Sequence, residues 1–367
     1  MKIERAIISG GGTGGHIFPA IAIADELKRR NPAVEILFVG AIGKMEMTKV
    51  PEAGYKIEGL EIVGFKRKLA LSNFLLPFKI IKSLLKARKI LKTFKPQVVI
   101  GVGGYASGPT LKAAAMLNFP TVVQEQNSFP GKTNKILSKG VSKICVAYEG
   151  LERFFPSEKI VLTGNPTRKE MVEIDGKQQE GFDFYGFDAS KKTILIIGGS
   201  LGARTLNESV VNHLDLLIEG DVQVLWQCGK LYHENLEEQL REKEMKSVKM
   251  VQFIQRMDLA YAIADVVISR AGAISVSELC LVKKPTILVP SPNVSEDHQT
   301  KNAMALVEKE AAILVKDIVA KEELIPLAIE LLRNEKKQAT LIENISKIGK
   351  PNATAEIVDV IESIVKK

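Results

Sequence analysis

The sequence predicts an α/β protein with two doubly wound parallel-sheet domains that face a central cleft. Short β-branched runs alternate with helical stretches, and this series occurs twice, each time with glycine-rich turns after its strands. The length agrees, because 367 residues exceed what one small core organises. Doubly wound sheets bind ligands at the carboxyl ends of their strands, so we expect the glycine turns to form the functional site.

The first series occupies the N-terminal half, with strands expected at residues 6–9, 35–39, 98–101 and 121–123. The first strand enters a glycine loop at 10–15, and a helical pattern at 20–27 follows it. The third strand runs into a second glycine turn at 103–109, before a helix of small residues. This order is typical of βαβ units in a parallel sheet.

The second series has strands expected at residues 193–197, 266–268 and 285–289, with glycine turns at 198–204 and 269–273. We place the domain boundary near residues 164–166. The polar, weakly periodic stretch at 175–192 predicts an irregular lead-in to the second sheet. Residues 353–365 predict an amphipathic helix, with a breaker and cap at 349–352.

Composition narrows the class of protein. Apolar residues make up 46% of the chain and charged residues 26%, as in soluble globular proteins. No uninterrupted apolar run is long enough to span a bilayer, and the N-terminus reads as a buried strand rather than a signal peptide. The three cysteines, Cys145, Cys228 and Cys280, are far apart and predict neither a disulfide framework nor a zinc site. We therefore expect a reducing cytoplasm.

Charge is distributed unevenly along the chain. Residues 1–165 hold 25 Lys and Arg against 12 Asp and Glu, whereas residues 166–367 hold 26 against 31. No acidic residue occurs from 62 to 124, and residues 64–95 mix basic with large apolar side chains. This pattern favours contact with an anionic membrane surface. The alternative is an ordinary amphipathic helix packed on the sheet. Nucleic acid is not expected, because aromatics are few and no binding motif occurs.

The glycine loop at 10–15 leads from a strand into a helix, where free backbone amides and the helix dipole favour an anion. Its spacing also satisfies the dinucleotide motif, but no carboxylate ends the second strand to hold a ribose. A Walker loop is excluded because no G-K-[ST] follows. The other alternative is that the glycines serve only turns and helix packing. His16, which ends the loop, titrates near neutrality.

In the second half, Glu278 lies about one turn into the helix after the glycine turn at 269–273. There a carboxylate accepts two hydrogen bonds from a ribose diol, while the first-turn amides face a diphosphate. A solvent-facing or capping glutamate in the first turn explains the pattern equally well.

Seven segments together resemble one family. They are GGGTGGHIFP at 10–19, GVGGYASGP at 101–109, EQNSFPGKTNK at 125–135, GNPTR at 164–168, GGSLGAR at 198–204, SRAGAISVSEL at 269–279 and DHQTKNA at 297–303. Their order resembles that of the MurG family, bacterial enzymes that transfer N-acetylglucosamine from UDP-N-acetylglucosamine (UDP-GlcNAc) to lipid I, making lipid II for peptidoglycan. The resemblance covers nearly the whole chain.

The resemblance implies the GT-B architecture, in which the last helix crosses back onto the N-terminal domain. It thus implies an N-terminal acceptor- and membrane-binding domain of residues 1–165 with 352–367, and a C-terminal UDP-sugar-binding domain of residues 166–351. The protein would then lie peripherally on the cytoplasmic face of the bacterial cell membrane.

The resemblance also implies roles for single residues. Those implied for UDP-GlcNAc in the C-terminal domain are Arg168 and Ser200 at the phosphates, Ile254 at the uracil, Ala273, Ile274 and Ser275 at the phosphate end of their helix, Glu278 at the ribose and Gln299 at the sugar hydroxyls. In the N-terminal domain, Thr13, Gly14, Gly15 and Asn127 would close over the sugar, and His16, Tyr105, Glu125 and Asn134 would surround the acceptor.

Transfer by one direct displacement inverts the anomeric carbon and needs a base for the acceptor hydroxyl. A helix N-terminus disfavours imidazolium, so we expect a neutral His16 to accept the proton, with Glu125 as the rival base. Glycine-loop amides and Arg168 would stabilise the leaving UDP. We expect no cofactor and no metal, since no D-x-D pair occurs. Other interpretations are a different GT-B enzyme with a lipid acceptor, a UDP-GlcNAc 2-epimerase, a nicotinamide-dependent oxidoreductase and a non-catalytic peripheral membrane protein.

Overall fold

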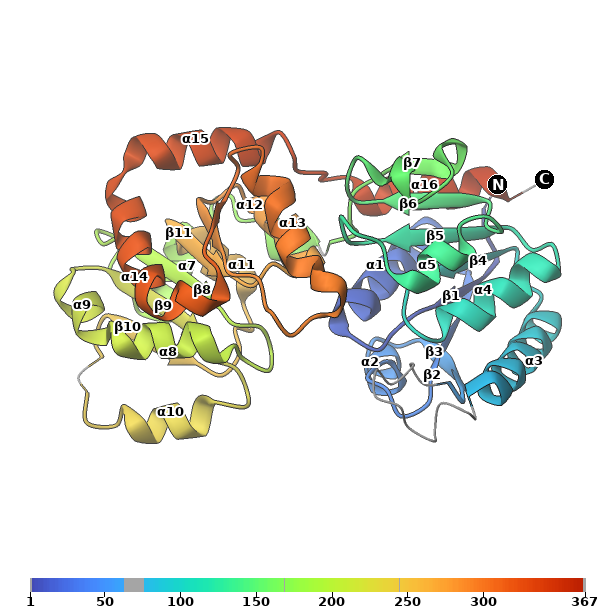
Figure 1. The fold of residues 1–367 in the computed structure, drawn as a ribbon, viewed down its shortest axis with the longest axis horizontal. Helices are drawn as coiled ribbons and strands as arrows, with labels where there is room; N and C mark the ends of the chain where they lie inside the picture. The colour runs from blue at the N-terminus through green and yellow to red at the C-terminus, as the bar shows by residue number, and fades with distance from the viewer. Residues whose placement is uncertain (1, 63–75, 168, 244, 366–367) are drawn as a thin grey trace. The chain divides into compact units, whose positions relative to one another are not determined.

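The computed structural model describes residues 2–62, 76–167, 169–243 and 245–365, which divide into two compact units (Figure 1). Unit 1 consists of Met1–Thr167 and Lys350–Lys367, and unit 2 of Arg168–Gly349. The chain passes between the units after Thr167 and after Gly349, and each point lies two residues from the boundary expected from the sequence. Each unit holds one parallel sheet, which confirms the predicted fold class.

The sheet of unit 1 has the strand order β3-β2-β1-β4-β5-β6-β7. The strands are β1 (Arg5–Ser9), β2 (Glu35–Ala41), β3 (Lys56–Leu60), β4 (Val98–Gly101), β5 (Thr121–Glu125), β6 (Lys143–Val146) and β7 (Ile160–Leu162). The order reverses between β1 and β4, whose last residues, Ser9 and Gly101, are paired. The loops that follow these strands therefore leave the sheet side by side, at its switch point.

Helices cover both faces of this sheet. They are α1 (Gly14–Arg30), α2 (Glu46–Glu52), α3 (Leu76–Phe94), α4 (Ser107–Met116), α5 (Lys132–Leu137) and α16 (Ala353–Ile364), with short 3₁₀ turns η2 (Leu151–Arg153) and η3 (Ser157–Lys159). Neighbouring residues of β1 enter different apolar clusters: Ile8 packs with α1 and α16, and Ile7 packs with α3 and α4. Strands buried on both faces read as continuous apolar runs, as the sequence does here.

Unit 2 repeats the arrangement with the strand order β10-β9-β8-β11-β12-β13. Its strands are β8 (Thr193–Ile197), β9 (Gln223–Gln227), β10 (Val248–Val251), β11 (Val266–Ser269), β12 (Thr286–Leu288) and β13 (Ile313–Leu314). Its helices are α6 (Lys169–Val172), α7 (Gln178–Tyr185), α8 (Arg204–Asn212), α9 (Leu214–Glu219), α10 (His233–Gln239), α11 (Met257–Ile263), α12 (Ala273–Val282), α13 (His298–Val307), α14 (Asp317–Arg333) and α15 (Glu335–Ser346), with the 3₁₀ turn η4 (Ser295–Asp297). The switch point lies between β8 and β11.

One local expectation was wrong, and another was confirmed in part. Residues 175–192 are not irregular throughout, because α7 forms within them and packs on α11. Gly181 permits that contact, since an added Cβ would lie 2.6 Å from Ile263 Cγ2 and 2.9 Å from the Leu259 carbonyl oxygen. Close approach through glycine replaces the apolar stripe that sequence patterns reveal. The cap expected before the last helix is confirmed in position, because Asn352 is the N-cap residue of α16, although its side chain makes no capping hydrogen bond.

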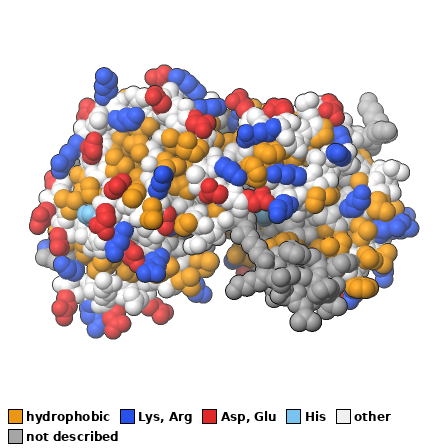
Figure 2. Space-filling view, viewed as in Figure 1, with side chains coloured by type: hydrophobic (Ala, Val, Ile, Leu, Met, Phe, Trp, Pro, Cys, Tyr) orange, Lys and Arg blue, Asp and Glu red, His pale blue; other side chains and the backbone are white. Residues whose placement is uncertain are grey.

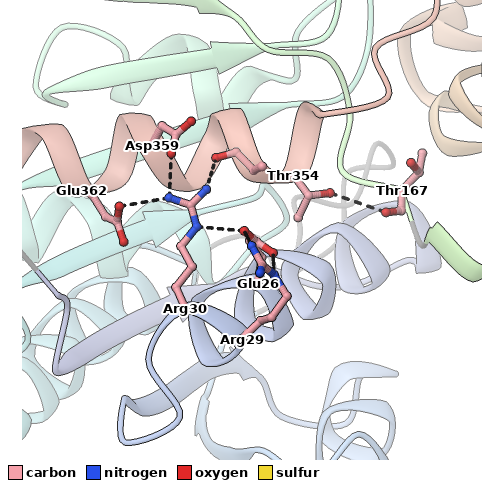
Figure 3. A network of polar contacts seen from close by, with 8 residues as sticks. Glu26, Arg29, Arg30, Thr167, Thr354, Asp359 and Glu362 are labelled. Carbon is pink, nitrogen blue, oxygen red and sulfur yellow. Dashed lines mark hydrogen bonds and ion pairs between the residues drawn. The ribbon is translucent and has the colours of Figure 1, made fainter.

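The C-terminal helix α16 is joined to α1 through Arg30 (Figure 3). The guanidinium donates to Glu26 Oε1 at 2.8 Å and, across the interface between the helices, to Asp359 Oδ1 at 2.6 Å. It also donates to Glu362 Oε2 at 3.0 Å and to the Ala355 carbonyl at 2.8 Å. These ion pairs and the shared apolar cluster make α16 part of unit 1.

Helix α3 has two different faces. Ser83, Ala87 and Leu91 are buried against the unit, whereas Phe78 is 72% exposed and Leu85 is 59% exposed. Basic and hydrophobic side chains are mixed on this edge of unit 1 (Figure 2). Within the described residues, no helix has both the length and the apolar character needed to cross a bilayer. Residues 64–75 of the basic segment lie outside the described residues.

Candidate active site

The two glycine loops of unit 1 meet at its switch point. The first glycine loop, residues 10–15, follows β1, and the second, residues 101–104, ends β4. The Gly11 N–H donates to the Gly103 carbonyl at 3.3 Å, and an added Cβ on Gly104 would lie 2.3 Å from the Gly11 carbonyl oxygen. Only glycines allow two backbones to approach so closely.

Packing accounts for Gly10 and backbone conformation for Gly12, but neither accounts for Gly15. An added Cβ on Gly10 would lie 2.1 Å from Val102 Cγ2, and Gly12 has a φ of +88°. Gly15 is different: its φ is not in the left-handed region, and beyond the backbone of its own helix an added Cβ would have only Thr13 Oγ1 within 4 Å, at 3.8 Å. The interpretation of the loop as purely structural therefore fits Gly10 and Gly12, while Gly15 leaves open space above the first turn of α1.

His16 lies in that first turn and contacts both glycine loops. Its Nδ1 lies 3.0 Å from the Gly11 carbonyl oxygen and 3.4 Å from Thr13 Oγ1. A carbonyl only accepts hydrogen bonds, so Nδ1 carries the proton in this contact. In a neutral ring the lone pair is then on Nε2. This atom faces Gly103, because an added Cβ on Gly103 would lie 2.9 Å from it. This is the tautomer that a base acting through Nε2 requires.

Glu46, which the sequence did not single out, lies behind the first loop. It is 1% exposed, and its carboxylate accepts the Gly12 N–H at 2.7 Å and the Ala41 N–H at 2.9 Å. The first acidic residue after β2 therefore faces the loop backbone and has both oxygens engaged, so it does not supply the ribose contact of a dinucleotide site. Gly40 makes room for this side chain, because an added Cβ there would lie 2.6 Å from Glu46 Cγ.

Glu125, at the end of β5, is 1% exposed and accepts four hydrogen bonds. The donors are the N–H and Nδ2 of Asn127 at 3.0 and 3.2 Å, the Gly131 N–H at 3.1 Å and Asn134 Nδ2 at 2.8 Å. Burial raises the pKa of Glu125, and these hydrogen bonds oppose the rise only in part. The structure thus brings Glu125, Asn127 and Asn134 together as one hydrogen-bonded group, in which Glu125 and Asn134 are buried. Tyr105, after β4, is 47% exposed.

The residues singled out in unit 2 follow adjacent strands. The last residues of β8, β9, β11 and β12 are paired across the sheet, and β10 pairs with β9. Ser200 follows β8, Ile254 follows β10, Ala273 begins α12 after β11, and Gln299 lies in α13 after β12. The carboxyl edge of one sheet therefore carries them all. Arg168 lies outside the described residues.

Within this edge, α12 presents its N-terminus with Ala273, Ile274 and Ser275 as its first turn. Gly272 resembles Gly15: its φ is −65°, and an added Cβ would meet only Ser275 Oγ, at 3.7 Å. Open space over the first turn of a helix suits an anion.

The polar side chains of this edge are partly oriented by the protein itself. Glu278 is buried, and the hydroxyl of Tyr261, itself buried, lies 3.4 Å from Glu278 Oε2. Gln299 Oε1 accepts the Ser291 N–H at 2.9 Å, which turns the amide nitrogen of Gln299 away from that contact. The Ile254 N–H donates to Gln227 Oε1 at 2.9 Å, so it is not available to a ligand.

Comparison with known proteins agrees with the two-unit arrangement. The glycosyltransferase family 28 N-terminal domain matches residues 6–146, and the glycosyltransferase family 28 C-terminal domain matches residues 193–361. Two doubly wound sheets with these domains define a glycosyltransferase of the GT-B class. A crystal structure of Acinetobacter baumannii MurG is similar at 30% identity and a TM-score of 0.79, with 98% of this chain and 99% of that chain covered.

Curated relatives extend the similarity over the full length. A Flavobacterium psychrophilum protein named UDP-N-acetylglucosamine–N-acetylmuramyl-(pentapeptide) pyrophosphoryl-undecaprenol N-acetylglucosamine transferase is 55% identical over 100% of this chain and 99% of its own. A Parabacteroides distasonis protein of the same name is 53% identical over 100% of both chains. The chain belongs to the MurG family of glycosyltransferases. A UDP-GlcNAc 2-epimerase from Neisseria meningitidis shares only the fold, at 15% identity and a TM-score of 0.67.

Proposed function

We propose that the chain transfers N-acetylglucosamine from UDP-GlcNAc to the 4-hydroxyl of the N-acetylmuramic acid residue of lipid I, forming lipid II. The observation that carries this proposal is end-to-end similarity to transferases of that name, at 55% and 53% identity. The glycine loops at both switch points support it, because each sheet then has a place for a diphosphate at its carboxyl edge.

The donor half of the site lies in unit 2 in this proposal. The amides of Ala273, Ile274 and Ser275, together with Ser200, meet the diphosphate of UDP, and Glu278 accepts the ribose hydroxyls. The backbone at Ile254 borders the uracil, and the amide nitrogen of Gln299 reads sugar hydroxyls. Arg168 is assigned to the phosphates from the family motif alone.

The acceptor half lies in unit 1. Nε2 of His16 takes the proton from the 4-hydroxyl of the acceptor, whose oxygen attacks the anomeric carbon of the sugar. The bond between that carbon and the diphosphate breaks, UDP leaves with the electron pair, and the anomeric configuration inverts. Backbone amides aimed at the departing charge stabilise it without reorganisation.

Glu125 has a different role in this proposal. A base must reach the hydroxyl that it deprotonates, and a carboxylate that already accepts four protein hydrogen bonds is poorly placed to do so. Glu125 therefore orders Asn127 beside the sugar and Asn134 beside the acceptor. Thr13, Gly14, Gly15 and Tyr105 border the substrates.

A transfer assay with the purified full chain, UDP-GlcNAc and a lipid I analogue tests the function. We expect lipid II analogue to form, and His16→Ala to lower kcat about 10²–10⁴-fold, the range of positioned acid–base catalysis. UDP binding, measured by calorimetry, should stay unchanged in that variant. Binding of NAD in place of UDP would favour an oxidoreductase, and undiminished turnover of His16→Ala would remove it from the base role.

We also propose that the chain binds the cytoplasmic face of the bacterial cell membrane through residues 64–95. Support comes from α3, where Phe78 and Leu85 are exposed beside Lys82 and Lys89. Two of the cations are partly engaged elsewhere, since Lys82 pairs with Glu61 at 2.7 Å and Lys86 donates to the Gly59 carbonyl. Each remaining cation contributes about 1 kcal/mol near an anionic leaflet. Vesicle co-sedimentation should therefore require anionic lipid and weaken with salt; equal binding to neutral vesicles would contradict the electrostatic part.

A further inference from the structure

Glu46 is a buried carboxylate with no role in the function proposed above. It begins α2, yet its side chain turns towards the first glycine loop, 34 residues away along the chain. Both of its hydrogen-bond donors, Gly12 and Ala41, are backbone amides rather than cationic side chains. Burying a carboxylate is costly unless its oxygens are fully hydrogen-bonded. An apolar side chain would fill the same space without that cost. The presence of glutamate here therefore indicates that its two carboxylate oxygens are needed as hydrogen-bond acceptors.

Two glycines make room for this carboxylate. An added Cβ on Gly11 would lie 2.2 Å from Glu46 Cδ, and one on Gly40 would lie 2.6 Å from Glu46 Cγ. Both glycines come from the loops or strand ends that Glu46 joins. The backbone is therefore shaped around the acid at two independent points.

The peptide group between Gly11 and Gly12 connects Glu46 to His16. Its N–H, on Gly12, donates to Glu46 Oε2 at 2.7 Å, and its C=O, on Gly11, accepts from His16 Nδ1 at 3.0 Å. In a planar trans peptide these two groups point in opposite directions. The carboxylate and the imidazole therefore hold opposite ends of one peptide plane.

A peptide between two glycines rotates easily, because neither residue has a Cβ to restrict it. If this plane turned over, it would present an N–H to His16 Nδ1 instead of a carbonyl. Nδ1 would then accept, the proton would move to Nε2, and the lone pair needed at Nε2 would be lost. The carboxylate opposes this, because only the observed orientation gives Oε2 the Gly12 N–H as a donor.

We propose that Glu46 is a positioning residue that fixes the Nε2 base tautomer of His16 through the Gly11–Gly12 peptide. The proposal rests on the proposed function only for its effect on turnover; its effect on the imidazole stands by itself. The carboxylate also polarises the peptide, because hydrogen bonds in a chain strengthen one another.

The test is Glu46→Gln in the full chain, with Glu52→Gln as the matched control on the exposed side of the same helix. Glutamine keeps one acceptor and turns an NH₂ towards the other amide, which weakens the hold on the peptide. We expect kcat to fall about 10- to 100-fold. KM for UDP-GlcNAc should stay within about twofold, and the acid limb of the kcat/KM–pH profile should shift. Glu52→Gln should match the wild type.

Nitrogen-15 NMR supplies a readout that does not depend on activity. The chain has four histidines, and His16→Ala assigns the His16 signals. In the wild type at pH 8, Nε2 should give the shift of an unprotonated nitrogen and Nδ1 that of a protonated one. In Glu46→Gln the two shifts should move towards each other as the second tautomer is populated.

The outcomes separate the two proposals. Unchanged nitrogen shifts and an unchanged pH profile in folded Glu46→Gln overturn the positioning role, whatever His16 does. Full turnover of His16→Ala overturns the base role of His16. The nitrogen-15 shifts then still test whether Glu46 fixes the tautomer. If Glu46→Gln does not fold, by circular dichroism and UDP binding, Glu46→Asp decides: it keeps the charge but moves both oxygens about 1.5 Å back, one carbon–carbon bond, so the same shifts should change.

Discussion

Gly15 is a glycine that neither its backbone conformation nor its packing requires. In the first turn of α1, alanine is the better helix former by up to about 1 kcal/mol, so Gly15→Ala should leave the unfolding temperature unchanged or raise it. If the open space belongs to a substrate, the added methyl group should still lower kcat/KM, by about 10- to 100-fold. Thermal unfolding and the transfer assay measure the two effects.

Gly140→Ala is the matched control, because an added Cβ there would also have only ordinary contacts, at 3.7 and 3.9 Å. Its activity should be that of the wild type. A fully active Gly15→Ala would mean that no substrate uses this space.

Glu278 offers a second test at the scale of one residue. A carboxylate that accepts a ribose hydroxyl contributes about 1.5–3 kcal/mol as a charged hydrogen bond. Glu278→Gln should therefore weaken UDP binding about 10- to 100-fold, while 2′,3′-dideoxy-UDP, which lacks both hydroxyls, should bind the variant and the wild type alike. Calorimetric titrations with both ligands check this. If the variant still bound UDP more tightly than the dideoxy compound by the wild-type factor, Glu278 would not contact the ribose.

At the scale of the element, α3 separates packing from surface function. Ser83, Ala87 and Leu91 hold it to the unit, so substitutions on the opposite face should spare the fold. Phe78→Ser with Leu85→Ser should lower binding to anionic vesicles at least about tenfold, because each large apolar side chain contributes about 1.5–3 kcal/mol when buried in lipid. Ile318→Ser, at an 88% exposed position on α14, is the control and should change nothing. Equal loss of vesicle binding in both proteins would indicate non-specific hydrophobic adsorption rather than a binding face on α3.

Elements also show where sequence reasoning succeeds and where it stops. Both sheets were predictable, because parallel strands buried on two faces leave apolar runs between helices. Helix α7 was not, because Gly181 replaces the apolar stripe with a close backbone contact. Glu46 was missed for a related reason. In the sequence a buried glutamate cannot be told from an exposed one, and only the folded chain brings Glu46 to Gly12. The family motifs named His16, but the contact of Nδ1 with Gly11 needed the structure.

At the scale of the whole molecule, the acid sensitivity of unit 1 should depend on Glu26. Hydrogen bonds from Arg29 and Arg30, with their charges, lower the pKa of Glu26 from 4.5 to about 2. A lowered pKa in the folded state gives stability that is complete above pH 4.5 and is lost as pH falls towards 2.

Glu26→Gln should thus lower the free energy of unfolding by about 1–2 kcal/mol at neutral pH, and by progressively less between pH 4.5 and pH 3. Urea titrations of both proteins across this range measure the gap. The exposed pair Glu343–Lys347 supplies the control, since Glu343→Gln should have little effect at any pH. A gap that stays constant with pH would contradict the assignment to Glu26.

The return of α16 to unit 1 has a consequence for biosynthesis. The ribosome completes Met1–Thr167 and must then make all of Arg168–Gly349 before the helix that covers α1 exists. At about 5–20 residues per second this takes roughly 10–40 s. During that interval the apolar surface that receives Ile357 and Ile361 has no cover, and Arg30 lacks its partners on α16. The first unit therefore cannot complete its own core until the second unit has been synthesised.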